Sequence, residues 1–292
     1  MSRAKVLGAA LVLVGAIATA GPTAAQVTVG TDVALFSSYV WRGVTYTNKF
    51  VVEPDVYLTF PAGKASITAG GWANIEPSAY DGAEDISENG TEGAGLTEFD
   101  WWGELSFPVG PATLTGGVTG YIFPNDAGFT SDANTVEIYG KVAFAGPLSP
   151  KLAVWYDVDN IKGAYFEGSV AHSVPLGAAS LNFGLLAGVS AGQGCELTGA
   201  KVYPDDCTAT PSYNFAEDGL THLDLSAAIP FSAGPLTIAP SVHALYLQTT
   251  NAKFTNAVNS NDFKGWLGVT ISWSKALGGA EEAAAEAEPA AE

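Results

Sequence analysis

Charged residues are scarce in this sequence of 292 residues. Asp, Glu, Lys and Arg together make up 14% of the chain, whereas soluble domains contain about 25%. Basic residues are the scarcer kind, with 12 Lys and Arg against 30 Asp and Glu, and the net charge is −18. Neither a basic cluster nor a Gly-rich phosphate-binding loop occurs, so we expect no nucleic-acid partner. With so few charged residues, much of the exterior surface is expected to lack well-hydrated side chains.

Long hydrophobic runs are also missing. The longest covers residues 6–18, and a membrane-spanning helix needs about 20 residues. This run follows Arg3 and Lys5 and precedes small residues, an order that predicts a secretory signal peptide over residues 1–25. Cleavage after Ala20 also fits. Its removal leaves ten basic and thirty acidic residues, a balance of −20 in an exported chain.

Cysteine is nearly absent, since Cys195 and Cys207 are the only two. In an exported protein two such cysteines can be oxidised, so we expect a disulfide between them. A metal site that adds Glu196, Asp205 and Asp206 is the alternative, and the lack of a nearby histidine counts against it. We therefore expect no metal and no other cofactor.

The feature that is present throughout is an alternation of apolar and polar side chains. In residues 96–108, Phe99 and Phe107 have one parity and Glu98 and Glu104 the other. A period of two predicts strands with one apolar and one polar face. Breaks at Gly, Pro, Asn or Asp divide the alternation into twelve predicted strands: 27–41, 50–60, 64–76, 96–108, 111–123, 133–144, 150–158, 163–174, 178–190, 218–231, 234–248 and 262–273.

The connections between these strands alternate in length. Short turns such as 61–63 are followed by long segments such as 77–95 and 191–217, with 159–162 as the exception. An even strand number with short turns at one end and long loops at the other is typical of outer-membrane barrels. A soluble β-sandwich would carry more charge, and a lipocalin-like barrel would have fewer strands and an apolar interior. We therefore predict an all-β fold, a twelve-stranded antiparallel transmembrane β-barrel over residues 26–275, in a Gram-negative outer membrane.

The first predicted strand ends in SSYVWRGVTYT, residues 37–47. We expect Tyr39 and Trp41 at the level of the lipid headgroups, where amphipathic rings are favoured. Arg42, the only arginine after the signal peptide, is then expected at the outer rim. There it pairs with lipopolysaccharide phosphate or a loop carboxylate, or it stays a solvated charge. Further girdle candidates share the outward parity: Trp101, Phe107, Tyr156, Phe231, Tyr246 and Trp273.

The same stretch, followed by EPDVYLTF, resembles the start of the TorF-type porin family, exported bacterial proteins of unknown function. The residues that carry the resemblance are Ser37, Tyr39, Trp41, Arg42, Gly43 and Pro54. The resemblance implies an outer-membrane barrel with channel activity, and it supplies no active site.

The C-terminal end departs from many outer-membrane barrels, whose last strand ends on an aromatic residue that is read during assembly. Here the last predicted strand ends at Trp273, and an Ala- and Glu-rich segment, residues 276–292, follows. An even number of strands places both termini in the periplasm. We expect this segment to be an acidic periplasmic tail, either disordered or docked as a short helix on a partner. The barrel-assembly machinery is an expected partner as well.

The polar parity of the strands is expected to face the lumen. A basic side chain that faced lipid near the midplane would cost about 2–4 kcal/mol, so this segregation is required. An acid-rich wall favours cations, although neutralisation of some acids by lysines or protons would weaken the preference. The predicted lumen and selectivity residues are Asp32, Glu53, Asp55, Glu98, Asp100, Glu104, Glu137, Lys141, Asp157, Glu167, Asp224 and His243.

Aromatic residues of lumen parity have two interpretations. They either fill a narrow barrel or form stacking surfaces for a planar or sugar-like solute. The acidic loop 77–95 is either solvated or holds calcium or magnesium next to lipopolysaccharide. Together with loop 191–217, it is a candidate gate.

Catalytic residues are not expected. The arrangement closest to nucleophile chemistry is His243 with Asp224, with Ser226 and Ser241 near. A polar pair that holds two strands in register accounts for it too, and no Gly-x-Ser-x-Gly motif accompanies it. The sequence thus predicts a passive channel that prefers cations and contacts outer-membrane lipids, lipopolysaccharide and small solutes. A non-conducting scaffold or receptor barrel is the alternative, and a barrel hydrolase is another. The oligomeric state is left open.

Overall fold

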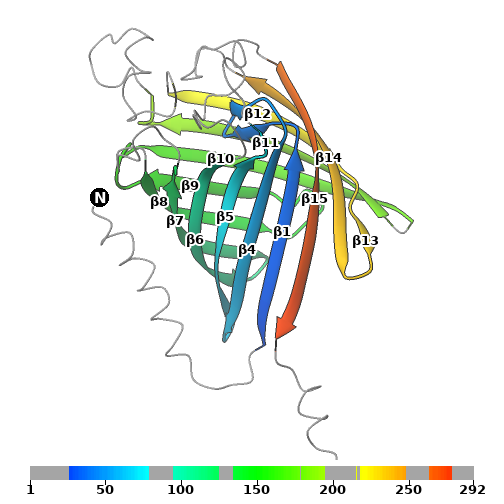
Figure 1. Cartoon of the computed structure of the whole chain (residues 1–292). Coiled ribbons are helices and arrows are strands. Elements are labelled where there is room, and N and C mark those ends of the chain that lie inside the picture. The colour runs from blue at the N-terminus through cyan, green and yellow to red at the C-terminus, as the bar shows by residue number, and fades with distance from the viewer. Residues whose placement is uncertain are drawn as a thin grey trace, which may run out of the picture.

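The structure is a computed structural model, and its long strands form one curved antiparallel sheet (Figure 1). It describes residues 26–78, 95–124, 134–177, 179–194, 215, 218–247 and 263–277. Outside the described residues lie the predicted signal peptide, most of both candidate gate loops, Cys195 and Cys207 with the alternative metal ligands, and residues 278–292. The predicted disulfide and acidic tail therefore stay predictions.

Twelve long strands of the described residues form the wall. They are β1 (Val27–Phe36), β4 (Val51–Ala62), β5 (Ala65–Glu76), β6 (Gly95–Val109), β7 (Ala112–Ile122), β8 (Thr135–Phe144), β9 (Lys151–Asp157), β10 (Ala164–Leu176), β11 (Ala179–Ala191), β12 (Gly219–Ala228), β14 (Leu236–Leu247) and β15 (Phe263–Leu277). The short β13 (Phe231–Ala233) pairs with β14 just after β12 ends. Each long strand pairs antiparallel with its neighbours, and β1 closes the wall by pairing with β15. The predicted twelve-stranded antiparallel barrel is confirmed.

Most strand bounds agree with the predicted ones, but the end of the first strand and the end of the last strand differ from the prediction. β15 continues to Leu277, four residues past the predicted end at Trp273, because its ladder with β1 continues to the pair Val27–Leu277. β1 instead ends at Phe36, five residues before the predicted end. Residues 37–50 leave the wall there. The described chain therefore begins and ends at the same end of the barrel.

The two faces of the wall differ as the alternation predicts. Large apolar side chains on its outer face are exposed, as at Leu105 (51%), Leu225 (60%) and Leu267 (63%). Their neighbours Glu104 and Asp224 point the other way and contact partners in the interior. An apolar exterior on a closed wall matches a lipid environment. Among the described residues, no helix has the length and the apolar character to cross a membrane.

The interior is narrowed by aromatic side chains that lie over glycines. A Cβ at Gly30 would fall 2.2 Å from the Tyr57 ring, and one at Gly117 would fall 2.3 Å from the Tyr139 ring. These glycines let bulky rings lie close against the neighbouring strand. Tyr57 and Tyr139 thus fill interior space, as the first of the two interpretations given above expects.

Short turns connect consecutive strands at the end of the barrel where the described chain begins and ends. Gly63, between β4 and β5, and Gly110, between β6 and β7, have φ of +66° and +57°. This left-handed conformation favours glycine and permits a tight reversal.

Candidate functional site

Residues 37–50, here called the inner hairpin, fold into the barrel from the end opposite the short turns. They contain β2 (Tyr39–Trp41) and β3 (Val44–Thr47), which pair with each other as a separate two-stranded sheet. The Ser37 amide donates to the Leu267 carbonyl at 2.9 Å, which fastens the start of the hairpin to β15. Val44 and Tyr39 are buried, with 2% and 6% of their surface exposed. The hairpin therefore occupies the lumen.

The prediction that Tyr39 and Trp41 lie at the lipid headgroups is wrong. The Tyr39 hydroxyl donates to Glu98 Oε2 at 2.7 Å. The Trp41 ring meets the ring of Tyr121 edge-on at 6.2 Å. Amphipathic rings suit a headgroup layer and a polar, aromatic-lined lumen equally well, because both offer one apolar and one wet side. Sequence alone does not separate the two.

The outer-rim position predicted for Arg42 is wrong as well. Its guanidinium donates to both carboxylate oxygens of Glu137 on β8, at 2.8 and 2.6 Å. It also lies 4.3 Å from the ring centroids of Trp41 and Tyr165. Only 7% of the Arg42 side chain and 2% of the Glu137 side chain are exposed. Tyr121 donates a further hydrogen bond to Glu137 at 2.8 Å. Arg42 thus fastens the hairpin tip to the opposite wall.

The tip reverses through two residues with positive φ. Arg42 has φ of 49° and Gly43 has φ of 86°. A Cβ at Gly43 would lie 2.6 Å from Cβ of His222 on β12, so the close approach requires glycine. His222, 4% exposed, stacks parallel to Tyr165 with ring centroids 6.4 Å apart. The hairpin tip therefore packs directly on β12.

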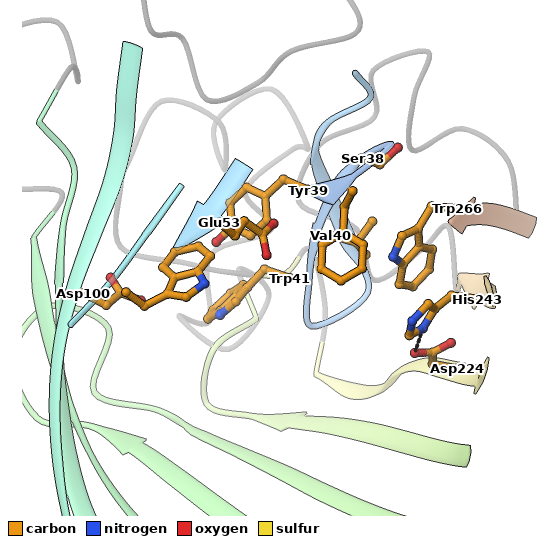
Figure 2. Close-up of a pocket in the computed structure, with 11 residues that line it drawn as sticks. Ser38, Tyr39, Val40, Trp41, Glu53, Asp100, Asp224, His243 and Trp266 are labelled. Carbon is orange, nitrogen blue, oxygen red and sulfur yellow. Dashed lines mark hydrogen bonds and ion pairs between the residues drawn. The ribbon is translucent and has the colours of Figure 1, made fainter. Parts of the chain in front are cut away.

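Two cavities lie beside the hairpin tip and share Val40, Trp41, Asp224 and Trp266 as lining residues. The first, called the acidic cavity, has a volume of about 400 Å³. The second, called the arginine cavity, has a volume of about 340 Å³. The acidic cavity is further lined by Phe36, Ser38, Tyr39, Glu53, Trp72, Asp100 and His243 (Figure 2). The arginine cavity adds Arg42, Gly43, Tyr121, Trp155, Tyr165, Glu167, Leu186, His222 and Leu245.

Carboxyl groups from three wall strands reach the acidic cavity. Glu53 on β4 and Asp100 on β6 are each 9% exposed. In the described residues, Oδ1 of Asp100 and Oδ1 of Asp224 are buried without a hydrogen-bond partner. Both aspartates line the cavity, and each has one buried carboxylate oxygen to which no described residue donates.

The pair formed by Asp224 and His243 lies at the other side of this cavity (Figure 2). His243 Nδ1 is 3.0 Å from Asp224 Oδ2, and the imidazole stacks on Trp266 at 4.5 Å. Ser226 is opposite His243 in the β12–β14 register, yet no hydrogen bond between their side chains occurs in the described part of the chain. Ser241 is opposite Ala228, further along. The pair joins β12 to β14 across the ladder.

The remaining predicted lumen residues separate into three groups. Asp32 and Asp55 face each other across the β1–β4 ladder. Glu104 accepts from the Lys141 ammonium at 3.0 Å and is neutralised by it. Glu167 lines the arginine cavity. Their predicted effect on selectivity stays a prediction.

Asp157 and Glu137 do not present free charge to the lumen, contrary to the prediction. Asp157 is 0% exposed. Its Oδ1 accepts from the amides of Asp159, Asn160 and Ile161 at 3.0, 2.9 and 3.0 Å. Both acids have the predicted inward parity, but Arg42 binds the carboxylate of Glu137 and loop amides bind that of Asp157. Sequence reasoning also missed the role of Asp218, the first residue of the predicted strand 218–231, which precedes β12 in the structure.

Asp218 shapes the segment that follows β11. Its carboxylate accepts from the Ser190 hydroxyl at 2.9 Å and from the amides of Gly192, Gln193 and Gly194 at 2.7, 3.1 and 3.0 Å. The segment lies near the inner hairpin, since Phe215 packs in one buried cluster with Val44. Asp218 lies 24 residues after Gly194 in the chain, so no local sequence pattern pointed to this role.

Comparison with known proteins assigns the family. Residues 19–205 match the Gcw_chp family, described as bacterial proteins of unknown function. The chain belongs to the Gcw_chp family. This result is consistent with the resemblance to TorF-type porins. No curated protein matches this Gcw_chp chain.

Several solved structures are similar to this Gcw_chp barrel. An outer membrane channel from Pseudomonas putida F1 has 10% identity and a TM-score of 0.44, over 88% of this chain and 97% of that chain. LpxR from Salmonella typhimurium has 8% identity and a TM-score of 0.43, over 84% and 99%. The KdgM porin has 6% identity and a TM-score of 0.40, over 84% and 98%. Similarities this low assign no function.

Proposed function

We propose that this Gcw_chp protein is an outer-membrane channel that passes small solutes by diffusion and favours cations. The observation that carries the proposal is a closed wall with apolar side chains outside and carboxyl groups with cavities inside. Such a wall separates a lipid phase from a polar interior, as porin-type barrels do. Transport down a gradient needs no further chemistry.

The preference for cations is supported by the balance of free charge. Arg42 and Lys141 are each paired with a glutamate, at 2.6 and 3.0 Å. Asp32 lies on β1 and Asp55 on β4, and the described residues place no ion pair on either. Field lines are focused inside a low-dielectric wall, so unpaired acids raise the local cation concentration.

In this proposal the inner hairpin is the constriction. Solutes pass between the hairpin tip and the wall, where the acidic and arginine cavities lie. The rate of passage then depends on how firmly Arg42 holds the tip to Glu137.

A non-conducting scaffold or receptor barrel is the second candidate. The observation that favours it is the burial of Arg42 and Glu137, since a buried and bidentate ion pair resists movement. We propose transport rather than catalysis because His243 and Asp224 lack a hydrogen-bonded serine nucleophile in the described residues.

Conductance in planar lipid bilayers tests the proposal. The purified chain is expected to produce discrete current steps, and the Arg42→Gln variant is expected to produce larger ones. Insertion is confirmed independently by protection of the barrel from protease in liposomes. Inserted barrels that carry no current, in both forms, would establish the scaffold role instead.

A further inference from the structure

The acidic cavity combines carboxyl groups with large aromatic walls. Glu53, Asp100 and Asp224 line it together with Trp41 and Trp266. Of the described residues that line it, none is lysine or arginine. A cavity with this lining repels anions and offers a cation both charge and π-faces.

Two of its carboxyl groups have capacity to accept hydrogen bonds. Asp100 is nine-tenths buried, and its Oδ1 has no partner in the described part of the chain. Oδ1 of Asp224 is also buried without a hydrogen-bond partner among the described residues. Buried polar atoms are ordinarily satisfied, so each unsatisfied acceptor points to a missing donor. An N–H group of a ligand supplies that donor.

Arg42 provides an internal example of how this interior holds a cation. Its guanidinium lies 4.3 Å from the centroids of Trp41 and Tyr165 while it donates to both oxygens of Glu137. The acidic cavity repeats this combination of aromatic faces and carboxylate, and it shares Trp41. Among the described lining residues, His243 contacts Asp224, and no lysine or arginine lies at Glu53 or Asp100.

We propose that the acidic cavity binds a small organic ammonium ion, a protonated primary or secondary amine with a compact apolar body. The ammonium donates to Asp100, and the apolar body lies against Trp41 and Trp266. The volume of about 400 Å³ admits a molecule of this size. An amine is preferred to a quaternary ammonium ion because the unsatisfied acceptors need N–H donors.

The site names the class of solute that the proposed channel would take, and in this respect it rests on the proposed function. Binding itself requires only the cavity. A measurement on the folded barrel in detergent therefore separates the two proposals.

Titration calorimetry with three matched probes tests the site on the purified full chain. Phenethylammonium carries the charge and the N–H donors, 2-phenylethanol lacks the charge, and phenethyltrimethylammonium lacks the donors. Phenethylammonium is expected to bind about tenfold or more tightly than either analogue, since a hydrogen bond to a charged group is lost in each case. Equal affinity for the alcohol would overturn the proposal. Equal affinity for the quaternary ion would overturn the role of Asp100 as the acceptor.

A pair of matched double variants locates the site. Glu53→Gln with Asp100→Asn removes two carboxyl groups from the cavity, and Asp32→Asn with Asp55→Asn removes two from the wall elsewhere. The cavity variant is expected to weaken phenethylammonium binding about tenfold or more, while the control keeps the affinity within about twofold. Equal losses in both variants would overturn the location. The probe comparison on the unaltered chain decides the matter where a variant does not fold.

Bilayer conductance separates this inference from the channel. Binding without current supports the site and overturns the channel. Current in a barrel that binds all three probes equally overturns the site and leaves the channel standing.

Discussion

Arg42 and Glu137, 95 residues apart in the chain, form a bidentate ion pair inside the barrel. The pair joins the tip of the inner hairpin to β8, and the guanidinium is enclosed by the rings of Trp41 and Tyr165. A single buried contact thus fixes the position of the segment that narrows the lumen. Most of the expected behaviour of this protein follows from it.

Replacing Arg42 by glutamine should destabilise the barrel and should also widen the path for solutes beside the hairpin tip. Glu137 would remain buried with its charge uncompensated, which costs about 3–5 kcal/mol. The released tip should raise single-channel conductance several-fold. Denaturant unfolding followed by tryptophan fluorescence measures the first effect, and planar bilayers measure the second.

Lys141→Gln is the matched control, because its pair with Glu104 is about a quarter exposed on both sides. Partly exposed pairs contribute about 1 kcal/mol or less, so a small change is expected. Arg42→Lys should not restore the native state, since an ammonium cannot bind both oxygens as the guanidinium does. Equal effects of the Arg42 and Lys141 variants would contradict the anchoring role.

Gly43→Ala should disturb the hairpin tip far more than an equivalent change at a turn. Gly43 has φ of +86°, and an added Cβ would lie 2.6 Å from His222 Cβ. Gly63 has φ of +66° with open space around it. Gly63→Ala therefore carries the backbone cost of about 1 kcal/mol alone, and Gly43→Ala carries this cost and the steric one. Thermal unfolding of the two variants compares them, and equal midpoints would show that the tip does not pack on β12.

Lysine at two adjacent positions should reveal which face meets lipid. Leu105 is 51% exposed on the outer face, and Ser106 points inward and bonds Thr115 across the ladder. Leu105→Lys should destabilise the barrel in bilayers by up to about 2–4 kcal/mol, the range for the midplane. Ser106→Lys should cost less, because the interior is polar and acidic. Reversible folding into lipid vesicles measures both, and the reverse order of stabilities would contradict the assignment of faces.

Substitutions of two inward-facing aspartates should have opposite effects: one should change stability and the other ion selectivity. Asp157→Ala removes the acceptor of three loop amides, so it should destabilise the barrel by about 1–3 kcal/mol and leave ion selectivity unchanged. Asp55→Asn should reduce cation selectivity with little effect on stability. Unfolding and reversal potential, measured on both variants, test this division. A selectivity change in the Asp157 variant would contradict its structural role.

The strands could be predicted from sequence because the alternation of side chains reports directly on the two faces of a wall. Phe99 and Glu98 already show which way β6 faces. Closure also followed, since turns and loops of alternating length suit an up-and-down barrel. The bounds of β1 and β15 were less accurate, because a ladder ends where its partner ends and the pair Val27–Leu277 is not visible in either segment alone.

The inner hairpin could not be predicted, for a physical reason. Its residues have the composition of a headgroup girdle, and what draws them inward is Glu137, a partner far along the chain. Two signals were available in the sequence. Arg42 is the only arginine after the predicted signal peptide, and the glycine that follows it permits a positive φ. The roles of Asp157 and Asp218 were hidden in the same way, because parity gives the direction of a side chain and not its partners.

The reversal potential of the purified, unaltered barrel in a planar bilayer with a potassium chloride gradient tests the central claim most directly. A channel lined by unpaired carboxylates should drive the zero-current potential toward the equilibrium value for potassium. A zero-current potential that is shifted toward the equilibrium value for chloride would contradict the acid-lined path through the barrel.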